Sequence, residues 1–247
     1  MRILINGIGG FMGKELARLC ADGCRGAELT AGADPFAKDC PVPCAASILE
    51  AETNVDCVID FSHHSCTQDL LTFCIKNNLP LVLATTGHTD EERAAIKTAS
   101  EKIPLFFAAN FSLGVALLID LAKRAAAALP DAEIEIVEAH HSRKLDAPSG
   151  TALAIADAIC DVRPEMSIHA GRSGYGKRET NEIGVHSIRM GNVVGEHEVL
   201  LCTASQTISL KHTAHSRALF AEGALAAAEF LCGKPKGLYA MQDILNG

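Results

Sequence analysis

The chain has 247 residues and a formal net charge of −8, and 48% of its residues are hydrophobic. This length suits one large α/β domain or two smaller ones with a buried core, and the acidic balance argues against nucleic acid as a partner. No apolar run approaches the roughly 20 residues of a membrane-spanning helix, and the start, MRILINGIGG, leads into a strand rather than a cleavable signal, so we expect a cytosolic protein with no membrane partner.

Strand-like apolar runs alternate with helix-period segments through the first 110 residues, which is typical of a parallel sheet covered on both faces. A capping-box pattern, Thr89 with Glu92, marks the start of the third helix in this series. The expected strands are residues 2–6, 27–34, 55–62, 79–87 and 103–112, and the expected helices are 12–22, 66–78 and 89–101.

The pattern changes after a long expected helix at 112–129. Apolar and polar residues then alternate in three segments, which indicates a mixed sheet with one face open to solvent or to a partner: 132–140, 186–190 and 197–204. A final helix at 216–233, ended by Gly233, is expected to pack on the first domain. We therefore predict an α/β fold with an N-terminal Rossmann-type parallel sheet and a second α+β domain with a mixed, open sheet.

Ten cysteines raise the question of disulfides or a metal site. The pairs Cys20-x3-Cys24 and Cys40-x3-Cys44 do not have the spacing of a zinc knuckle, and the other six cysteines lie singly in apolar segments. In a reducing compartment such thiols behave as small hydrophobic side chains. We predict structural thiols and no metal.

A glycine-rich turn connects the first strand to the first helix. Gly7, Gly10 and Gly13 allow a tight turn and a close approach of the backbone to a pyrophosphate at the helix N-terminus, although a purely structural turn has the same residues. Asp34 ends the second strand, where a ribose hydroxyl needs an acceptor. This carboxylate favours NADH over NADPH, while Lys14 and Lys38 leave use of both open.

The segment EAHHSRKLDAPSGTALAIADAI, residues 138–159, combines groups that suit a small anion. His140 is a candidate proton donor, Lys144 supplies a cation, and Gly150 and Thr151 begin a helix whose N-terminus attracts carboxylate or phosphate. A packed histidine and an ordinary capped helix explain the same pattern.

Two adjacent histidines on a strand point to opposite faces, so His140 and His141 do not suit one metal ion. The two remain separate candidates.

Through this segment and several other motifs, the chain resembles the dihydrodipicolinate reductase family. The resemblance extends over nearly the whole chain outside residues 36–54 and is carried by these motifs: GIGGFMG, VIDFS, TTG, AANFSLGV, EAHHSRKLDAPSGTA, GRSGYGKR, IGVHSIRMGNVVGEH and HSRALFAEGA.

The resemblance implies roles for individual residues. His140 would be the catalytic proton donor and Lys144 the catalytic residue that anchors or polarises the substrate, while His141, Gly150 and Thr151 would bind it. The implied cofactor-binding residues are Gly7, Gly10, Phe11, Met12, Gly13, Asp34, Thr85, Thr86, Gly87, Ala109, Asn110 and Phe111. Phe11 stands where the family commonly has an arginine, which bears on phosphate contacts and on NADPH use.

The implied reaction is reduction of the dianionic cyclic imine 4-hydroxy-2,3,4,5-tetrahydrodipicolinate by hydride from NADH or NADPH, with loss of water, in lysine and diaminopimelate biosynthesis. Residues 1–111 and 217–247 would form the dinucleotide-binding domain. Residues 112–216 would bind substrate and join a homotetramer through their sheet. Two alternatives remain from the residues alone: another two-domain NAD(P)-dependent dehydrogenase acting on a small carboxylate, and a non-catalytic NADH-binding sensor.

Overall fold

The computed structural model describes residues 1–247, which divide into two compact units. The first unit contains residues 1–112 and 218–247, and the second contains residues 113–217. None of the helices has the length and apolar character needed to cross a membrane.

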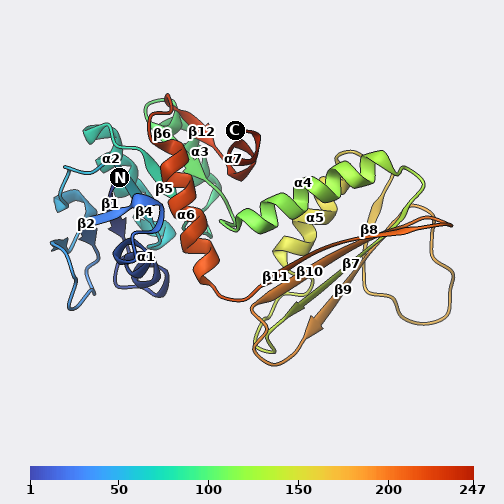
Figure 1. Cartoon of the computed structure of the whole chain (residues 1–247). Helices are drawn as coiled ribbons and strands as arrows, with labels where there is room; N and C mark the ends of the chain where they lie inside the picture. Colours follow the sequence, from blue (N-terminus) through green and yellow to red (C-terminus); the bar gives the residue numbers. More distant parts are fainter. The chain divides into compact units, whose positions relative to one another are not determined.

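The first unit is built on a parallel sheet of seven strands in the order β12-β6-β5-β4-β1-β2-β3 (Figure 1). The strands are β1 (Arg2–Asn6), β2 (Glu28–Ala33), β3 (Cys44–Ala45), β4 (Cys57–Asp60), β5 (Leu81–Leu83), β6 (Pro104–Phe107) and β12 (Gly237–Tyr239). The order reverses direction at β1, and in open α/β sheets ligands bind at such a switch point, beyond the carboxyl ends of the strands.

Helices cover both faces of this sheet. They are α1 (Phe11–Ala21), α2 (Thr67–Asn77), α3 (Asp90–Ser100), α6 (Ala218–Leu231) and α7 (Met241–Asn246), with short 3₁₀ turns η1 (Cys24–Gly26), η2 (Ile48–Glu50) and η3 (His64–Cys66). Leu4 and Val58 pack with side chains of α2 and α3, while α6 packs on α1, β4, β5 and β6. Because successive strand residues face opposite sides, this double cover explains why Leu4 and its neighbour Ile5 are both fully buried.

The second unit has a mixed sheet of five strands in the order β11-β10-β7-β9-β8. The strands are β7 (Glu133–His140), β8 (Ser167–Ala170), β9 (Glu182–Arg189), β10 (Gly195–Cys202) and β11 (Thr207–Ala214). Strand β7 pairs antiparallel with β10 and parallel with β9. Helices α4 (Leu113–Ala128) and α5 (Gly150–Cys160) lie together on one side of this sheet (Figure 1), where Ile134 and Ile136 are buried with them.

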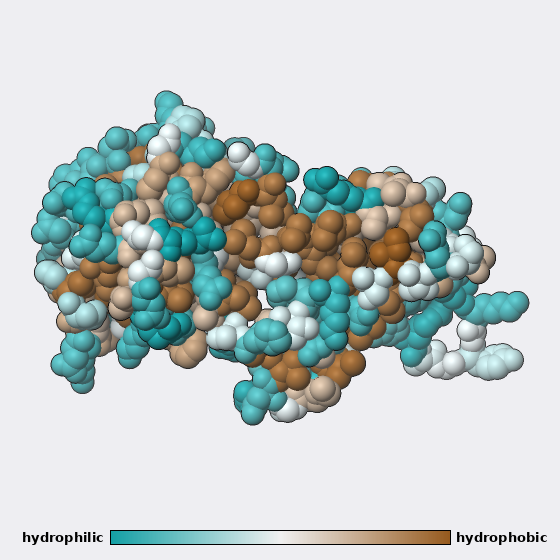
Figure 2. Space-filling view, in the orientation of Figure 1, coloured by the Kyte–Doolittle hydropathy of each residue, from teal (hydrophilic) through white to brown (hydrophobic).

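Helix α4 also carries hydrophobic side chains on its exposed side. Leu117 and Leu121 are 45% and 42% exposed, whereas Leu118 and Ala122 are buried in the core of the second unit. Figure 2 shows the corresponding brown surface over this helix.

The two sheets and the main helices agree with the sequence prediction, and their ends differ by a few residues. The capping box of Thr89 and Glu92 is present, and Gly233 follows α6 with φ +82°. Elements that the pattern did not indicate are short or polar: β3, β12 and β8 have two, three and four residues, α7 has six, and β11 exposes Thr207, Ser209 and Lys211.

Candidate active site

The glycine turn after β1 excludes side chains by contact with the backbone. A Cβ at Gly7 would lie 2.7 Å from the Phe61 carbonyl oxygen, and one at Gly13 would lie 2.2 Å from the Gly7 carbonyl oxygen. Gly7 also has φ +82°, a conformation that favours glycine. Gly10 caps α1 without a side-chain hydrogen bond. The turn therefore leaves the start of α1 open to an anion, as a pyrophosphate requires.

Asp34 lies beside this turn at the end of β2. Its two carboxylate oxygens accept hydrogen bonds from the Gly9 N–H at 2.9 Å and the Phe36 N–H at 2.8 Å. Gly7, Gly10 and Asp34 line one cavity of about 360 Å³. The structure thus brings together the glycines and the acid that sequence spacing alone had linked.

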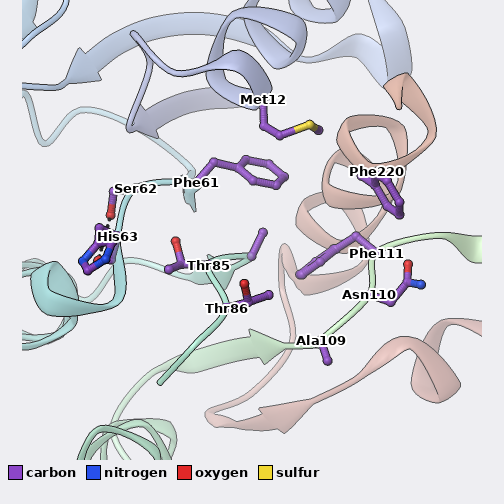
Figure 3. A pocket seen from close by; sticks show the side chains of 11 residues that line it. Met12, Phe61, Ser62, His63, Thr85, Thr86, Ala109, Asn110, Phe111 and Phe220 are labelled. Carbon is purple, nitrogen blue, oxygen red and sulfur yellow. Dashed lines mark hydrogen bonds between the residues drawn. The ribbon is translucent and has the colours of Figure 1, made fainter. Parts of the chain in front are cut away.

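A second cavity, of about 440 Å³, opens beyond the ends of β4, β5 and β6. Six of the predicted cofactor residues line it: Met12, Thr85, Thr86, Ala109, Asn110 and Phe111. Figure 3 shows Met12 and Phe61 on one side and Phe111 and Phe220 on another, with the two threonines below them. Flat apolar walls with a few hydroxyl and amide groups suit a nicotinamide ring and its carboxamide. Gly87 does not line the cavity but has φ +86° in the turn that follows the threonines.

Five residues without a role predicted from the sequence also line this cavity: Phe61, Ser62, His63, Ala84 and Phe220. The signal for the first two was the motif VIDFS, which carried the family resemblance as a whole.

Asp60, from the same motif, binds two residues that line this cavity, Ser62 and Thr85. It is 1% exposed and accepts hydrogen bonds from Asn6 Nδ2 at 2.7 Å, Ser62 Oγ at 2.7 Å and Thr85 Oγ1 at 2.6 Å. Burial raises the pKa of the Asp60 carboxyl, and these hydrogen bonds partly oppose the rise. Asp60 therefore fixes Thr85 against the end of β4.

In the second unit, His140 lies at the end of β7 and points to the side covered by α5. Its Nδ1 is 2.6 Å from Glu138 Oε2, and its ring is 5.2 Å from the ring of His197. Glu138 also pairs with Arg189 and accepts a hydrogen bond from the Ser149 N–H at 3.1 Å. The proton-donor candidate and the start of α5 are therefore joined through one carboxylate.

The start of α5 has the form expected of a capped helix. Ser149 is its N-cap and accepts a hydrogen bond from the Ala152 N–H, and Gly150 and Thr151 form the first turn. The preceding Ala147–Pro148 peptide bond is cis.

Lys144 and His141 lie on the segment between β7 and α5. Lys144 Nζ is 2.8 Å from Asp146 Oδ1, and the Asp146 side chain is 56% exposed, so this ion pair is loose enough to exchange for an anionic ligand. Burial, together with the positive charges of Arg143 and Arg217, lowers the pKa of His141, whose Nδ1 is buried with no partner. Both side chains remain candidates for substrate contact.

This cluster contains three further residues for which the sequence predicted no role: Glu138, Arg189 and His197. The last two lie in the motif IGVHSIRMGNVVGEH, which contributed to the resemblance without assigned functions. All ten cysteines are free thiols, and no group of three or more His, Cys, Asp or Glu side chains is arranged to hold a metal ion.

Comparisons with known proteins show the family of this chain. The family model for the N-terminus of dihydrodipicolinate reductase matches residues 1–111, and the model for its C-terminus matches residues 114–245. The chain belongs to the dihydrodipicolinate reductase family. This is a family of pyridine-nucleotide-dependent reductases.

Named relatives are similar along the whole chain. The 4-hydroxy-tetrahydrodipicolinate reductases of Caldanaerobacter subterraneus and Clostridium novyi are each 42% identical over 248 residues, which is 98% of their own length. A solved dipicolinate-bound dihydrodipicolinate reductase from Paenisporosarcina is 28% identical, with a TM-score of 0.81 and 97% of each chain covered. A probable dehydrogenase from Thermotoga maritima, 12% identical with a TM-score of 0.62, shares the fold alone.

Proposed function

We propose that this chain reduces 4-hydroxy-2,3,4,5-tetrahydrodipicolinate to tetrahydrodipicolinate, an oxidoreductase step of lysine and diaminopimelate biosynthesis. One hydride and one proton are taken up, the 4-hydroxyl leaves as water, and NAD(P)H becomes NAD(P)⁺. The observation that carries the proposal is the Glu138–His140 pair beside the start of α5, in a chain that matches the family along its length.

The first unit is proposed to hold the dinucleotide. The glycine turn accommodates the pyrophosphate, because the carbonyl oxygens of Phe61 and Gly7 leave no room for side chains at Gly7 and Gly13. Asp34 accepts a hydrogen bond from a ribose hydroxyl, and the cavity around Thr85 receives the nicotinamide. When bound, the nicotinamide supplies the hydride that enters ring position 4 of the substrate.

Asp34 also bears on the choice of cofactor. Its negative charge opposes a 2′-phosphate, and Phe11, 68% exposed, offers no positive charge at the start of α1. We therefore favour NADH, with NADPH as a second cofactor.

The second unit is proposed to hold the dianionic ring. One carboxylate lies at the start of α5, against Gly150 and Thr151, where the helix dipole favours negative charge. Lys144 exchanges its contact with Asp146 for the substrate, and His141 contributes to the same pocket. Two separated positive sites match a substrate with two carboxylates.

His140 is proposed to deliver the proton. Hydride addition leaves the ring electron-rich at carbon, and a positioned, protonated imidazole can transfer its Nε2 proton there and become neutral, a contribution worth typically 100-fold or more in rate. His140 is buried apart from a 9% exposed fraction, which limits exchange of its proton with bulk water.

A homotetramer joined through the second sheet is part of the proposal. The side of this sheet opposite α4 and α5 has no helix over it (Figure 1), and Ile188 is 42% exposed there. Size-exclusion chromatography with light scattering tests this point, and a monomer would contradict it.

The reaction is tested by a coupled assay. Aspartate semialdehyde, pyruvate and the synthase that precedes this step generate the substrate, and loss of nicotinamide absorbance is followed with NADH and with NADPH. Turnover with at least one cofactor is expected, and its loss in His140→Gln supports the assigned donor. No turnover with either cofactor would remove the proposal.

Ligand binding gives a second readout. Pyridine-2,6-dicarboxylate, a planar mimic of the ring, should raise the melting temperature of the protein when NADH is present. A non-catalytic NADH sensor would not respond to it.

A further inference from the structure

Glu138 is a fully buried carboxylate with every oxygen engaged. Oε2 accepts hydrogen bonds from His140 Nδ1 at 2.6 Å and Arg189 Nη1 at 2.8 Å, and Oε1 accepts them from Arg189 Nη2 at 2.7 Å and the Ser149 N–H at 3.1 Å. Burial opposes ionisation, but the hydrogen bonds from Arg189, His140 and Ser187 outweigh it and lower the pKa of Glu138 to about 2. Glu138 is therefore an acceptor only, which places a proton on Nδ1 of His140.

The His140 ring is also restricted by contacts with residues other than Glu138. The ring of His197 lies edge-on to it, and His197 Nε2 contacts Ser149 Oγ at 3.1 Å. A Cβ at Gly195 would lie 3.1 Å from His140 Nε2, so only glycine fits without displacing the imidazole. These contacts fix the orientation of the ring: Nδ1 keeps its proton toward Glu138, so the proton that the protonated imidazole gives up must be the one on Nε2.

We propose that Glu138 is a positioning residue that fixes the tautomer and orientation of His140 and ties that ring to the start of α5. The inference rests on the proposed function, in which His140 donates the proton and α5 binds a substrate carboxylate. This carboxylate then sets the spacing between the proton donor and the anion site, because Oε2 binds the His140 ring and Oε1 binds the backbone N–H of Ser149 at the start of α5. Arg189 acts through Glu138 by compensating the charge of this buried carboxylate.

Strand β7 offers a matched comparison. Glu135, three residues before Glu138, pairs with His186 at 2.7 Å and with Arg178 at 3.2 Å, the same three side-chain types. This trio faces the other side of the sheet, and both partners of its carboxylate–imidazole pair are about one-third exposed. Glu135 is therefore a control for removing a carboxylate from an Arg and a His without touching the candidate site.

The test uses the full-length protein with three variants: Glu138→Gln, Glu138→Gln with Arg189→Met, and Glu135→Gln. Glu138→Gln removes the carboxylate that compensates the charge of Arg189 and is expected to lower the melting temperature, and the double variant is expected to recover it. Both should lower kcat about 100-fold, the lower end of a general-acid contribution, with a smaller change in KM. Glu135→Gln should keep kcat within about 2-fold of the original protein.

A spectroscopic readout is independent of turnover. Proton NMR of protein labelled with ¹⁵N-histidine should show a low-field Nδ1–H resonance that disappears in His140→Gln and in both Glu138 variants and remains in Glu135→Gln. A folded double variant with near-original kcat, or a low-field resonance that survives loss of Glu138, overturns the inference. Failure of the proposed function is distinct, because the original protein would then not oxidise NAD(P)H, while the resonance still reports on the pair.

Discussion

The contact between Gly195 and His140 gives a sharp test of the assigned proton donor. In Gly195→Ala the new Cβ lies 3.1 Å from His140 Nε2 and 3.5 Å from Cδ2, whereas ordinary carbon contacts begin near 3.4 Å or beyond. The imidazole must therefore move by a few tenths of an ångström. Because a misplacement of about 1 Å can cost 100-fold in rate, we expect kcat to fall about 10-fold, or about 1.4 kcal/mol.

Stability should change much less than turnover. Crowding of this size costs about 1 kcal/mol, and replacing a glycine whose φ is not in the left-handed region recovers about 0.5–1 kcal/mol through the unfolded chain. Gly195→Ala should thus melt near the original temperature, in contrast to a general loss of structure. The matched control is Gly176→Ala, where a Cβ meets nothing within 4 Å.

The assay is the coupled reduction under saturating NADH, with melting temperatures measured for the same samples. Unchanged kcat in Gly195→Ala would mean that the position of His140 does not limit the reaction, and the assigned proton donor would be wrong. An equal loss in Gly176→Ala would mean that the effect is not specific to this contact.

Three further changes test other parts of the site. Lys144→Met should lower kcat/KM by a factor that corresponds to about 3 kcal/mol of transition-state stabilisation, by analogy with the loss of one charge-stabilising donor. The affinity for NADH, measured by calorimetry, should not change. A kcat/KM within a few-fold of the original would contradict the role of Lys144 as an anchor. Asp34→Ser should shift kcat/KM toward NADPH by about 5-fold, since one like charge about 4 Å away in water costs about 1 kcal/mol, and an unchanged NADPH/NADH ratio would count against the ribose contact. Burial lowers the pKa of His197 to about 4, so the folded protein resists its protonation. The unfolding free energy should therefore fall by about 3 kcal/mol as pH falls from 6.5 to 4, as measured by denaturant titrations at these two pH values. His197→Gln should remove this fall, and a fall that persists in the variant would mean that His197 does not cause it.

The fold could be predicted from the sequence because the strands of the two units differ in the spacing of their hydrophobic residues. Continuous apolar runs such as RILIN marked the buried parallel strands, and alternation in AEIEIVEAH marked the half-covered ones. Local chemistry was also predictable, since the glycine turn, the capping box at Thr89 and the start of α5 each depend on residues within one turn of each other.

The contacts of His140 were not predictable in the same way. Arg189 and His197 are 49 and 57 positions away from it, and they reach Glu138 and Ser149 only because β7 pairs with β9 and β10 in one register. A shift of one residue would reverse every side chain, and no local pattern fixes that register. The motif therefore predicted which residues form the site, whereas their geometry depends on how β7 pairs with β9 and β10.

The division of the chain has a consequence for synthesis. The second unit is one continuous stretch, 113–217, whereas the first depends on residues 218–247 for the edge strand β12 and for helix α6 over β4, β5 and β6. On the ribosome the second unit can therefore complete its contacts while the first still exposes the strand surface that α6 will cover. Nascent chains halted after residue 217 should bind chaperones through that uncovered apolar surface, and should release them once residues 218–247 emerge.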